Sequence, residues 1–371
     1  MEEAAFSLCD DLGPAKIVHV HEPGIGLRAT LVVDNVAAGP SIGGLRMAPD
    51  VSTEECFRLA RAMTLKNAAA GLPHGGAKSV LYGDPRMPRE RKERLVRALA
   101  CALRGCDDYI FGPDMGTDET AMAWVHDEIG RAVGLPRELG GIPLDEIGAT
   151  GFGLRHAAEV ASRHVGIALA GARFVVQGFG SVGMHASRFL AEQGAVLVAA
   201  SDSAGAIADR AGLDVLALVE LKRSGKSVAG HRAGTRIAPD ELVAVECELW
   251  IPAARPDVIR ADNAPRLRAK LVIAGANIPL TDEAERSLHA RGVVCVPDFI
   301  ANAGGVICAA MEWRGATQAA VFEAIAERIR ANTAAVLEAS AQRRVLPRQA
   351  AVELARERVQ SAMATRRWSI F

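Results

Sequence analysis

The sequence has no long apolar run and no strong excess of charge of either sign. Every apolar stretch is broken by a charged residue, Gly or Pro well before the roughly 18 residues that a membrane span requires. The formal net charge is -1 over 371 residues, so no long-range positive field attracts a polyanion. We therefore expect a protein with neither a membrane nor a nucleic acid as partner.

The cysteines and histidines form no metal-binding or disulfide pattern. Seven cysteines are scattered along the chain without a C-x-x-C pair, and no secretory leader precedes them. The nine histidines include no H-E-x-x-H motif, and the closest pair, His19 and His21, shares one face of an expected strand. These patterns indicate reduced thiols, a cytoplasmic location and no bound metal.

Length and patterning predict an α/β protein of two domains separated by a cleft. Half of the residues are apolar, and the chain is long enough to bury two hydrophobic cores. In the first part, residues 16–35 alternate as two strands around the turn Glu22-Pro23-Gly24. Helices are expected over residues 52–70, 88–104 and 118–133, before a Gly/Pro-rich joint at residues 134–151.

Beyond the joint, apolar strands alternate with helices, which is typical of a doubly wound parallel sheet. The expected strands cover residues 173–177, 196–201, 249–252, 271–274 and 293–296. The chain ends in helix from about residue 317 to 363, interrupted at Pro347. We assign residues 141–340 to a Rossmann-like dinucleotide-binding domain, and residues 1–140 with the C-terminal helix, about 341–371, to the other domain.

A dinucleotide-binding motif stands at the expected place in the second part. Gly178-Phe179-Gly180-Ser181-Val182-Gly183 directly follows the strand at 173–177 and opens a helix. Glycines let the backbone approach a pyrophosphate, whose charge then meets the helix N-terminus. Asp202 ends the next strand and is expected to accept hydrogen bonds from the adenosine ribose. Asp202 favours NAD, while Ser203 and Gly205 beyond it leave room for the phosphate of NADP.

Two lysines and one aspartate lie among residues of little bulk. Lys66 precedes, and Lys78 ends, a glycine-rich loop that begins at Gly71. A lysine in such a loop is easily desolvated, which lowers the pKa of its ammonium toward the range of an acid or base. Asp114 lies in a Gly/Pro-rich segment, and Asp118 is the better placed cap of the following helix, which leaves Asp114 for another role.

These motifs together resemble the glutamate, leucine, phenylalanine and valine dehydrogenase family over nearly the whole chain. The segments that carry the resemblance are Lys66-Asn67, Leu72-x-x-Gly75-Gly76-Ala77-Lys78, Pro113-Asp114, Ala149-Thr150-Gly151, the glycine motif, Gly275-Ala276-Asn277 and Asn302-Ala303-Gly304-Gly305-Val306. The resemblance implies NAD- or NADP-dependent oxidative deamination of an L-amino acid to a 2-oxo acid and ammonia. It also implies a homo-oligomer whose first domain binds the substrate and mediates oligomerisation.

The resemblance further implies a role for each matched residue. Lys66 would hold the substrate α-carboxylate, Lys78 would polarise the carbonyl or activate water, and Asp114 would carry protons to and from the amino group. Thr150 would meet the nicotinamide amide, while Asn277 and Asn302 would border the nicotinamide ribose and the substrate amino group. Further expected contacts are Gly43 and Val306 with the substrate, and Ala253, Asp202, Ser203 and residues 178–183 with the dinucleotide.

Two positions predict the side chain of the substrate. Glutamate dehydrogenases carry a lysine where this chain has Ile42 and a serine where it has Ala309. In those enzymes the lysine and the serine bind the carboxylate of the glutamate side chain. An unpaired carboxylate against two apolar residues costs several kcal/mol, so we expect a leucine-, valine- or phenylalanine-like substrate. Within the family the resemblance is closest to the leucine dehydrogenase branch, but other segments depart from it, so glutamate and tryptophan or another aromatic amino acid are alternative substrates. A non-catalytic sensor on the same scaffold is a further alternative.

Overall fold

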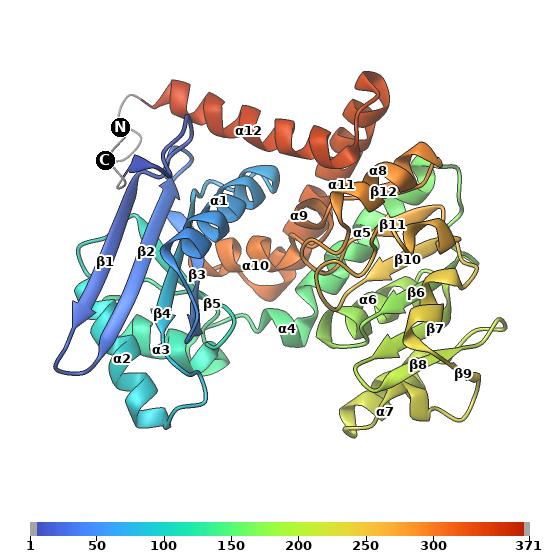
Figure 1. Ribbon diagram of the computed structural model, residues 1–371, viewed down its shortest axis with the longest axis horizontal. Helices are drawn as coiled ribbons and strands as arrows, with labels where there is room; N and C mark the ends of the chain where they lie inside the picture. Colours follow the sequence, from blue (N-terminus) through green and yellow to red (C-terminus); the bar gives the residue numbers. More distant parts are fainter. Residues whose placement is uncertain (1–5, 367–371) are drawn as a thin grey trace. The chain divides into compact units, whose positions relative to one another are not determined.

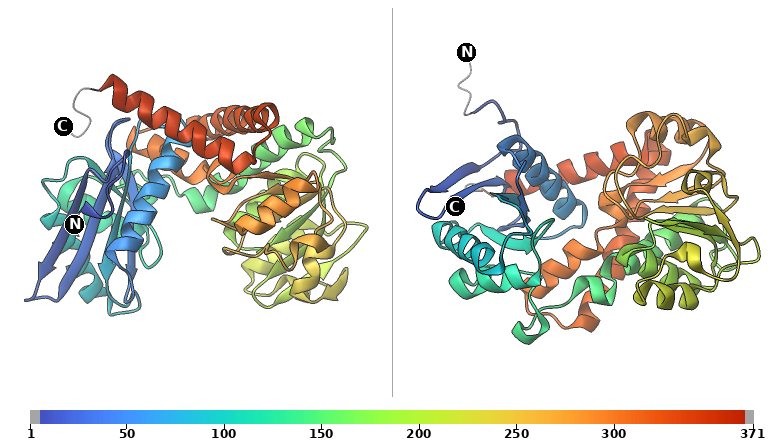
Figure 2. Two further views of the ribbon diagram at one scale, coloured as in Figure 1. Left: turned by 45° about the horizontal axis from the view of Figure 1, so that its top comes forward. Right: turned by 60° about the horizontal axis from the view of Figure 1, so that its bottom comes forward.

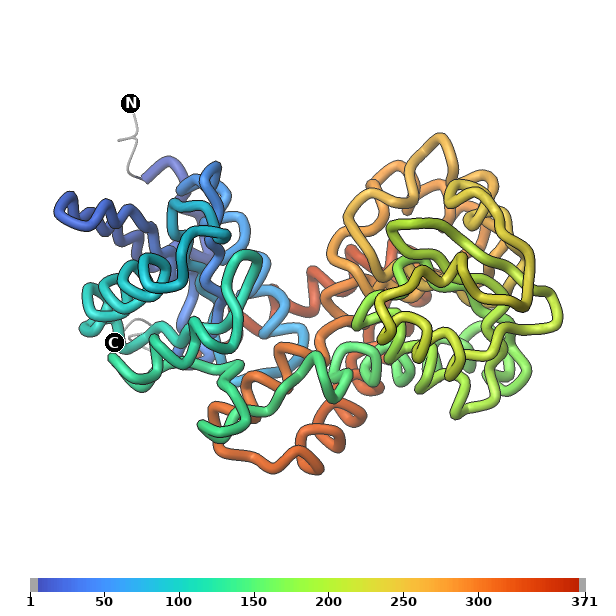
Figure 3. The backbone as a smooth tube through the Cα atoms, turned by 90° about the horizontal axis from the view of Figure 1, so that it is seen from below, coloured from blue at the N-terminus to red at the C-terminus, as the bar shows by residue number. Residues whose placement is uncertain are grey.

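The computed structural model describes residues 6–366, which divide into two compact units (Figure 1). Unit 1 comprises the chain up to Pro143, Val306–Val321 and the chain from Leu354, while unit 2 comprises Leu144–Gly305 and Phe322–Glu353. The chain can be followed through these passages in Figure 3.

The observed division differs from the predicted one near the end of the chain. The first boundary lies three residues beyond the predicted residue 140. Val306–Val321 belongs to unit 1, although the sequence places it in the dinucleotide domain, and residues 341–353 belong to unit 2. Helical periodicity does not indicate which unit a helix packs against, which explains the difference. Residues 367–371 of the expected terminal helix lie outside the described chain.

Unit 1 is built on a five-stranded mixed sheet in the order β1-β2-β4-β3-β5. Its strands are β1 (Lys16–Glu22), β2 (Leu27–Asn35), β3 (Ser41–Ala48), β4 (Gly76–Tyr82) and β5 (Tyr109–Pro113). β2 pairs antiparallel with β1 and β4, whereas β3 pairs parallel with β4 and β5. β1 and β2 confirm the predicted hairpin. The other three were not predicted, because strands buried on both faces lack an apolar-polar alternation.

Helices cover both faces of this sheet, as Figure 2 shows. α2 (Arg89–Ala102) and α3 (Glu119–Ile129) pack on one face, together with Leu45 and Met47 of β3. α1 (Thr53–Ala69) packs on the other face, against Ala48 and Val80. Because side chains alternate along a strand, residues two apart share a face. The even-numbered residues of β3 and β4 therefore lie on the face that α1 covers.

Unit 2 contains a seven-stranded sheet in the order β12-β11-β10-β6-β7-β8-β9. The strands are β6 (Arg173–Gln177), β7 (Val196–Asp202), β8 (Gly205–Ala208), β9 (Thr235–Ile237), β10 (Leu249–Pro252), β11 (Leu271–Ile273) and β12 (Val294–Val296). The five from β12 to β7 run parallel, which confirms the predicted doubly wound sheet. β8 and β9 add an antiparallel edge that the sequence did not predict.

Further helices complete the two units. They are α4 (Leu144–Ile147), α5 (Ala149–His164), α6 (Ser181–Ala191), α7 (Val215–Arg223), α8 (Asp282–Ala290), α9 (Asp298–Ala301), α10 (Gly304–Trp313), α11 (Gln318–Arg343) and α12 (Pro347–Thr365). Short 3-10 helices are η2 (Arg137–Leu139), η3 (Val228–Gly230), η4 (Pro239–Ala244) and η5 (Ala264–Arg266). α10, α11 and α12 each contribute residues to both units.

Within residues 6–366, no helix is long and apolar enough to cross a membrane. The same residues include no group of three or more His, Cys, Asp or Glu side chains that could hold a metal ion. All seven cysteines are free thiols. The cytoplasmic location inferred from the sequence stays a prediction.

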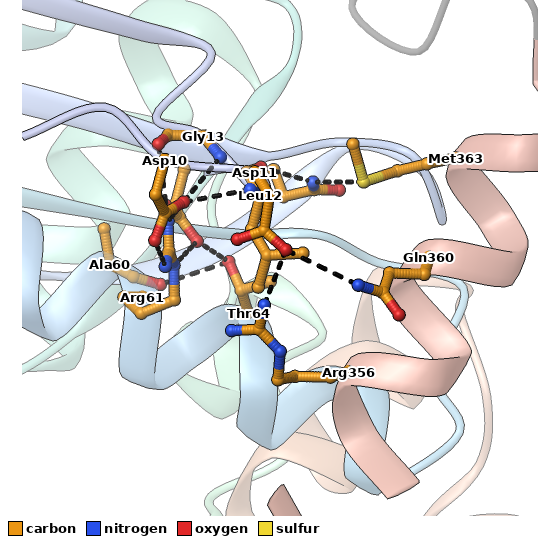
Figure 4. A network of polar contacts seen from close by, with 12 residues as sticks. Asp10, Asp11, Leu12, Gly13, Ala60, Arg61, Thr64, Arg356, Gln360 and Met363 are labelled. Atoms are coloured by element: carbon orange, nitrogen blue, oxygen red, sulfur yellow. Dashed lines mark hydrogen bonds and ion pairs between the residues drawn. The ribbon is translucent and has the colours of Figure 1, made fainter. Parts of the chain in front are cut away.

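A polar network ties the start of unit 1 to α1 and α12 (Figure 4). Arg61 on α1 donates from Nε to both carboxylate oxygens of Asp34 on β2, at 2.9 and 3.1 Å. The same guanidinium pairs with Asp10 at 2.6 Å, and Asp11 pairs with Arg356 of α12 at 2.6 Å. The Asp34 side chain is fully buried, so its charge depends on Arg61 far more than the charge of Asp10 does.

Replacing Arg61 by Met should therefore lower the free energy of unfolding by about 3–5 kcal/mol, because it leaves a buried carboxylate unpaired. The control Asp10→Ala removes a partner that is 43% exposed and should cost less than about 1 kcal/mol. Urea unfolding monitored by circular dichroism measures both losses. Equal losses in the two variants would contradict the role of Arg61 as the counter-ion of Asp34.

Candidate active site

Three charged side chains meet on the α1 face of the unit 1 sheet. Nζ of Lys78, on β4, lies 2.9 Å from Oδ1 of Asp114, which follows β5. Nε of Arg46, on β3, lies 2.7 Å from Oδ2 of the same carboxylate. The central strand β3 pairs with β4 on one side and with β5 on the other, which brings the three residues together. The Asp114 carboxylate thus lies between two cations.

A glycine on β3 leaves room for this pair. A Cβ at Gly44 would lie 2.8 Å from Cβ of Asp114 and 3.1 Å from Nζ of Lys78, closer than a side chain can pack. Ile42 lies two residues before Gly44 on the same strand and is 4% exposed. Since residues two apart share a face, Ile42 lies on the face of the sheet that carries Lys78 and Asp114.

Burial and charge shift the pKa values of the Lys78–Asp114 pair. Lys78 is only 4% exposed, and burial lowers the pKa of its ammonium below the usual value, although Asp114 opposes that shift. Burial raises the pKa of the Asp114 carboxyl, but Lys78 and Arg46 outweigh it and hold this pKa below its ordinary value. An ammonium that loses its proton readily beside a carboxylate that stays ionised is suited to acid-base catalysis.

The structure corrects the predicted setting of Lys78. The glycine-rich loop ends at Gly75, and Lys78 is the third residue of β4 rather than a loop residue. Its burial therefore comes from the packing of α1 on the sheet and not from a lack of neighbouring side chains. Cys56 of α1 lies close enough for its thiol to donate to the backbone carbonyl of Lys78, at 3.1 Å.

Sequence reasoning missed two residues that position this site, Arg46 and Asn67. Arg46 also pairs with Glu55 of α1 at 2.7 Å, so two carboxylates hold its guanidinium. The buried Asn67 follows Lys66 near the end of α1 and donates to the carbonyls of Gly75 at 2.7 Å and Ile42 at 3.4 Å. Asn67 lies inside a segment that carries the family resemblance and Arg46 does not, and only the folded structure reveals the partners of either residue.

Val306 and Ala309 lie on the part of α10 that belongs to unit 1. Val306 is half-buried, and Ala309 is 9% exposed. Glu312 fixes this helix, because its carboxylate accepts the backbone N–H groups of Gly134, Leu135 and Ile142 at 2.8, 3.1 and 3.0 Å. The contact of Val306 and Ala309 with a substrate side chain stays a prediction from the resemblance.

In unit 2, the glycine motif forms the turn between β6 and α6. Gly178 has a φ of +97°, and a Cβ there would lie 2.7 Å from the backbone nitrogen of Ala254. α6 begins at Ser181, and no side chain of the described residues caps it. The first N–H groups of this helix are therefore available to an anion. This turn fits the pyrophosphate of a dinucleotide.

Asp202 ends β7 as predicted, but the protein itself occupies its carboxylate. Oδ1 accepts hydrogen bonds from Ser227 Oγ at 2.8 Å and Ala204 N at 3.0 Å, and Oδ2 accepts from Lys222 Nζ at 2.8 Å and Val228 N at 3.0 Å. Burial would raise the pKa of Asp202, but these donors outweigh it and lower the pKa to about 2. Four donors use the acceptor capacity of a carboxylate, so the expected hydrogen bonds from a ribose find no acceptor position here.

Ala253, Asn277 and Asn302 follow strands at the carboxyl edge of the sheet, where ligands of such folds bind. Asn302 Nδ2 donates to Asn277 Oδ1 at 2.9 Å, which joins the segments after β11 and β12. Thr150 is the second residue of α5 and is half-buried. The residues that this edge brings together are Gly178–Gly183, Ala253, Asn277 and Asn302, with the exposed Ser203 after β7.

The predicted residues thus form one set in each unit. Unit 1 holds the substrate set, which consists of Ile42, Gly43, Lys66, Lys78, Asp114, Val306 and Ala309, while unit 2 holds the dinucleotide set. Asn302, predicted for both ligands, lies in unit 2.

Comparison with protein families agrees with this two-part arrangement. A family model for the dimerisation domain of Glu/Leu/Phe/Val dehydrogenases matches residues 14–131, and the Glutamate/Leucine/Phenylalanine/Valine dehydrogenase model matches residues 140–367. The chain belongs to this family. It is an amino-acid dehydrogenase, an oxidoreductase that acts on the CH–NH2 group of its donor with NAD or NADP as acceptor.

Curated proteins that resemble this chain include glutamate dehydrogenases. The glutamate dehydrogenase of Aeropyrum pernix is 39% identical over 292 residues, which are 75% of this chain and 70% of that protein. The NADP(+)-dependent glutamate dehydrogenase of Pyrobaculum calidifontis is 38% identical over 362 residues, which are 91% of this chain and 86% of that protein.

Solved structures of the family share the fold. The hetero-hexameric glutamate dehydrogenase from Thermus thermophilus, in a leucine-bound form, has a TM-score of 0.83 at 31% identity and covers 95% of this chain and 90% of its own. The L-tryptophan dehydrogenase from Nostoc punctiforme has a TM-score of 0.75 at 25% identity and covers 95% of this chain and 97% of its own.

Replacing Arg46 by Met should raise the pKa of Asp114, because it removes one of the two cations that hold the carboxyl below its ordinary value. Because the reaction uses the ionised carboxylate of Asp114 as a base, the acidic limb of the plot of kcat/KM against pH should move to higher pH. The control Arg46→Lys keeps the charge and should move this limb less. An acidic limb that stays in place in Arg46→Met would contradict the electrostatic role.

Proposed function

We propose that this dehydrogenase deaminates an L-amino acid with an apolar side chain, such as leucine, valine or phenylalanine. The observation that carries the proposal is the place of Ile42, a buried apolar residue on the face of the sheet that carries Lys78 and Asp114. The products are the 2-oxo acid and ammonia.

A second carboxylate on the substrate would need a cation on this face. Arg46 is the cation next to Lys78, and its guanidinium already pairs with Asp114 and Glu55. Placing an acidic side chain against Ile42 therefore costs several kcal/mol, as for any buried charge without a partner. The same position accepts an aliphatic or aromatic side chain without that cost.

Glutamate is the second candidate substrate, because the relatives from Aeropyrum pernix and Pyrobaculum calidifontis are glutamate dehydrogenases, and these relatives support glutamate better than a leucine-like substrate. Tryptophan or another aromatic amino acid is supported by the likeness to the tryptophan dehydrogenase and by the small side chain of Ala309. A non-catalytic sensor is disfavoured, since the buried pair of Lys78 and Asp114 supplies the groups that the chemistry needs.

We assign the proton chemistry to Lys78 and Asp114. Lys66 binds the α-carboxylate of the substrate through its ammonium. Lys78, as the neutral amine, takes a proton from the water that adds to the imine, and the resulting ammonium donates a hydrogen bond to the carbinolamine oxygen, which stabilises the negative charge that develops on it as ammonia leaves. Asp114 takes a proton from the substrate amino group and returns one to the leaving ammonia. Arg46 keeps Asp114 ionised between these steps.

We propose that unit 2 binds the dinucleotide through the turn at Gly178–Gly183, with Thr150, Ala253, Asn277 and Asn302 along the nicotinamide half. When bound, the nicotinamide ring accepts the hydride from the substrate α-carbon. The occupied carboxylate of Asp202 removes the sequence argument for NAD over NADP, so both dinucleotides are kept as cofactors.

We also propose that the chain forms a homo-oligomer. The match of residues 14–131 to a dimerisation-domain model supports this assembly. Its subunit number follows from light scattering of the purified protein.

Lys78→Ala should reduce kcat by about 100-fold or more, since it removes the group that stabilises the developing negative charge. Asp114→Asn keeps the shape and removes the proton acceptor, and it should lose activity to a similar extent. Binding of NADH should stay unchanged in both, because its residues lie in unit 2. Lys270→Ala, at an exposed lysine, is the control. Either variant with more than a tenth of wild-type turnover would refute its catalytic role.

A panel of L-amino acids, assayed for NADH and NADPH formation at alkaline pH, tests the substrate. The unmodified enzyme should favour leucine-like substrates over glutamate by about 100-fold or more in kcat/KM. The double variant Ile42→Lys with Ala309→Ser should move this ratio toward glutamate, and each single change should do less. Preference of the unmodified enzyme for glutamate, or an unmoved ratio in the double variant, would overturn the apolar substrate.

A further inference from the structure

An amide pair stands at the carboxyl edge of the unit 2 sheet. Nδ2 of Asn302 donates to the carbonyl of Gly275 at 3.2 Å and to Oδ1 of Asn277 at 2.9 Å. Oδ1 of Asn302 is buried and accepts no hydrogen bond from any residue between 6 and 366. Because Nδ2 donates both of its hydrogen bonds within the protein, the orientation of the Asn302 amide is fixed, and so is the direction in which Oδ1 can accept a hydrogen bond. The amide pair therefore offers a ligand an acceptor with a fixed orientation.

Asp298 contacts the backbone of both segments that carry this pair. Its carboxylate oxygen Oδ2 accepts the backbone N–H of Ile278, the residue after Asn277, at 2.9 Å. Its backbone carbonyl accepts the N–H of Asn302 at 2.7 Å. Asp298 thus contacts both segments, the one after Asn277 through its side chain and the one at Asn302 through the backbone bond that closes the last turn of α9.

The segment that Asp298 holds has a strained backbone. Ile278 has a φ of +48°, which is rare for a β-branched residue, and its side chain lies largely in solvent, with 58% of the residue exposed. Its carbonyl accepts the N–H of Asp257, which itself has a φ of +52°. Apolar packing of Ile278 does not account for this conformation, so the hydrogen bonds to Asp298 and Asp257 maintain it, and the bond to Asp298 is the one made by a side chain.

Arg348 holds the other oxygen of the same carboxylate. Nη1 of Arg348 lies 2.9 Å from Oδ1 of Asp298, and its Nε lies 2.7 Å from Oε2 of Glu285. The two carboxylates are 7% and 3% exposed, so both depend on this one cation. With Oδ1 fixed by Arg348, Oδ2 faces the N–H of Ile278. Arg348 lies in the first turn of α12, the helix that continues into unit 1.

We propose that Asp298 is a positioning residue for the nicotinamide half of the dinucleotide. With one oxygen it holds the strained segment at Ile278, and with the other it is held by Arg348, so that Asn277 and Asn302 meet the ligand in one fixed arrangement. This inference rests on the proposed function, which assigns Asn277 and Asn302 to the nicotinamide ribose and the substrate amino group.

The test compares the binding of NADH with that of ADP by calorimetry in the full-length protein. ADP has the adenosine and the pyrophosphate but lacks the nicotinamide ribose, so it does not reach the amide pair. Asp298→Asn should weaken NADH binding about tenfold and leave ADP binding within about twofold. The matched control Glu285→Gln breaks the other ion pair of Arg348 and does not touch Ile278. It should lower the thermal unfolding temperature and leave the ratio of the two affinities unchanged.

Equal weakening of NADH and ADP in Asp298→Asn would overturn the proposal, because it would indicate general damage to unit 2. Unchanged NADH binding in a folded variant would overturn it as well. If Asp298→Asn does not fold, Arg348→Lys provides the comparison, since it loosens Oδ1 and keeps the charge, and the same change in the affinity ratio is expected. The amino-acid panel tests the substrate separately, so a refuted substrate with a selective loss of NADH binding would still support the role of Asp298.

Discussion

The ion pair between the buried Lys78 and the partly exposed Asp114 organises the candidate active site. Burying either charge alone is costly, and the pair is tolerated because each group has a partner at hydrogen-bond distance and Arg46 satisfies the second carboxylate oxygen. The same burial lowers the pKa of Lys78, so the feature that makes the pair costly to fold also makes it useful as an acid and base.

The strand pairing in the mixed sheet of unit 1 brings Lys78 and Asp114 close enough to form an ion pair. Parallel pairing of β3 with both β4 and β5 places three strands side by side, each with one residue of the site on the α1 face. Gly44 has no side chain that would collide with Lys78 and Asp114, and Ile42 is a buried apolar residue on the same face of the sheet. In unit 2 the corresponding constraint is the backbone at Ile278, which a buried carboxylate holds in a conformation that the residue alone disfavours.

The sequence predicted the parallel strands of unit 2, the first hairpin and the helix cap at Asp118, because these depend on local patterns of apolar and capping residues. It did not predict β3, β4 and β5, whose burial on both faces hides the alternation, and so it placed Lys78 in a loop. The roles of Arg46 and Asp298 were also missed. Their partners lie on other strands and helices, which no spacing along one segment indicates. Asp202 was found by its spacing, but its four donors come from loops that the motif does not include.

The titration of Lys78 tests whether burial lowers the pKa of this residue and suits it to act as an acid and base. The chain has only seven lysines, Lys16, Lys66, Lys78, Lys92, Lys222, Lys226 and Lys270, so 13C-methylated lysine signals can be followed by NMR and the Lys78 signal assigned with the Lys78→Arg variant. We expect the pKa of Lys78 to lie below the ordinary lysine value and to fall further in Asp114→Asn, because Asp114 raises it. A Lys78 signal that titrates at or above the ordinary value would refute a role for Lys78 as an acid and base in this site.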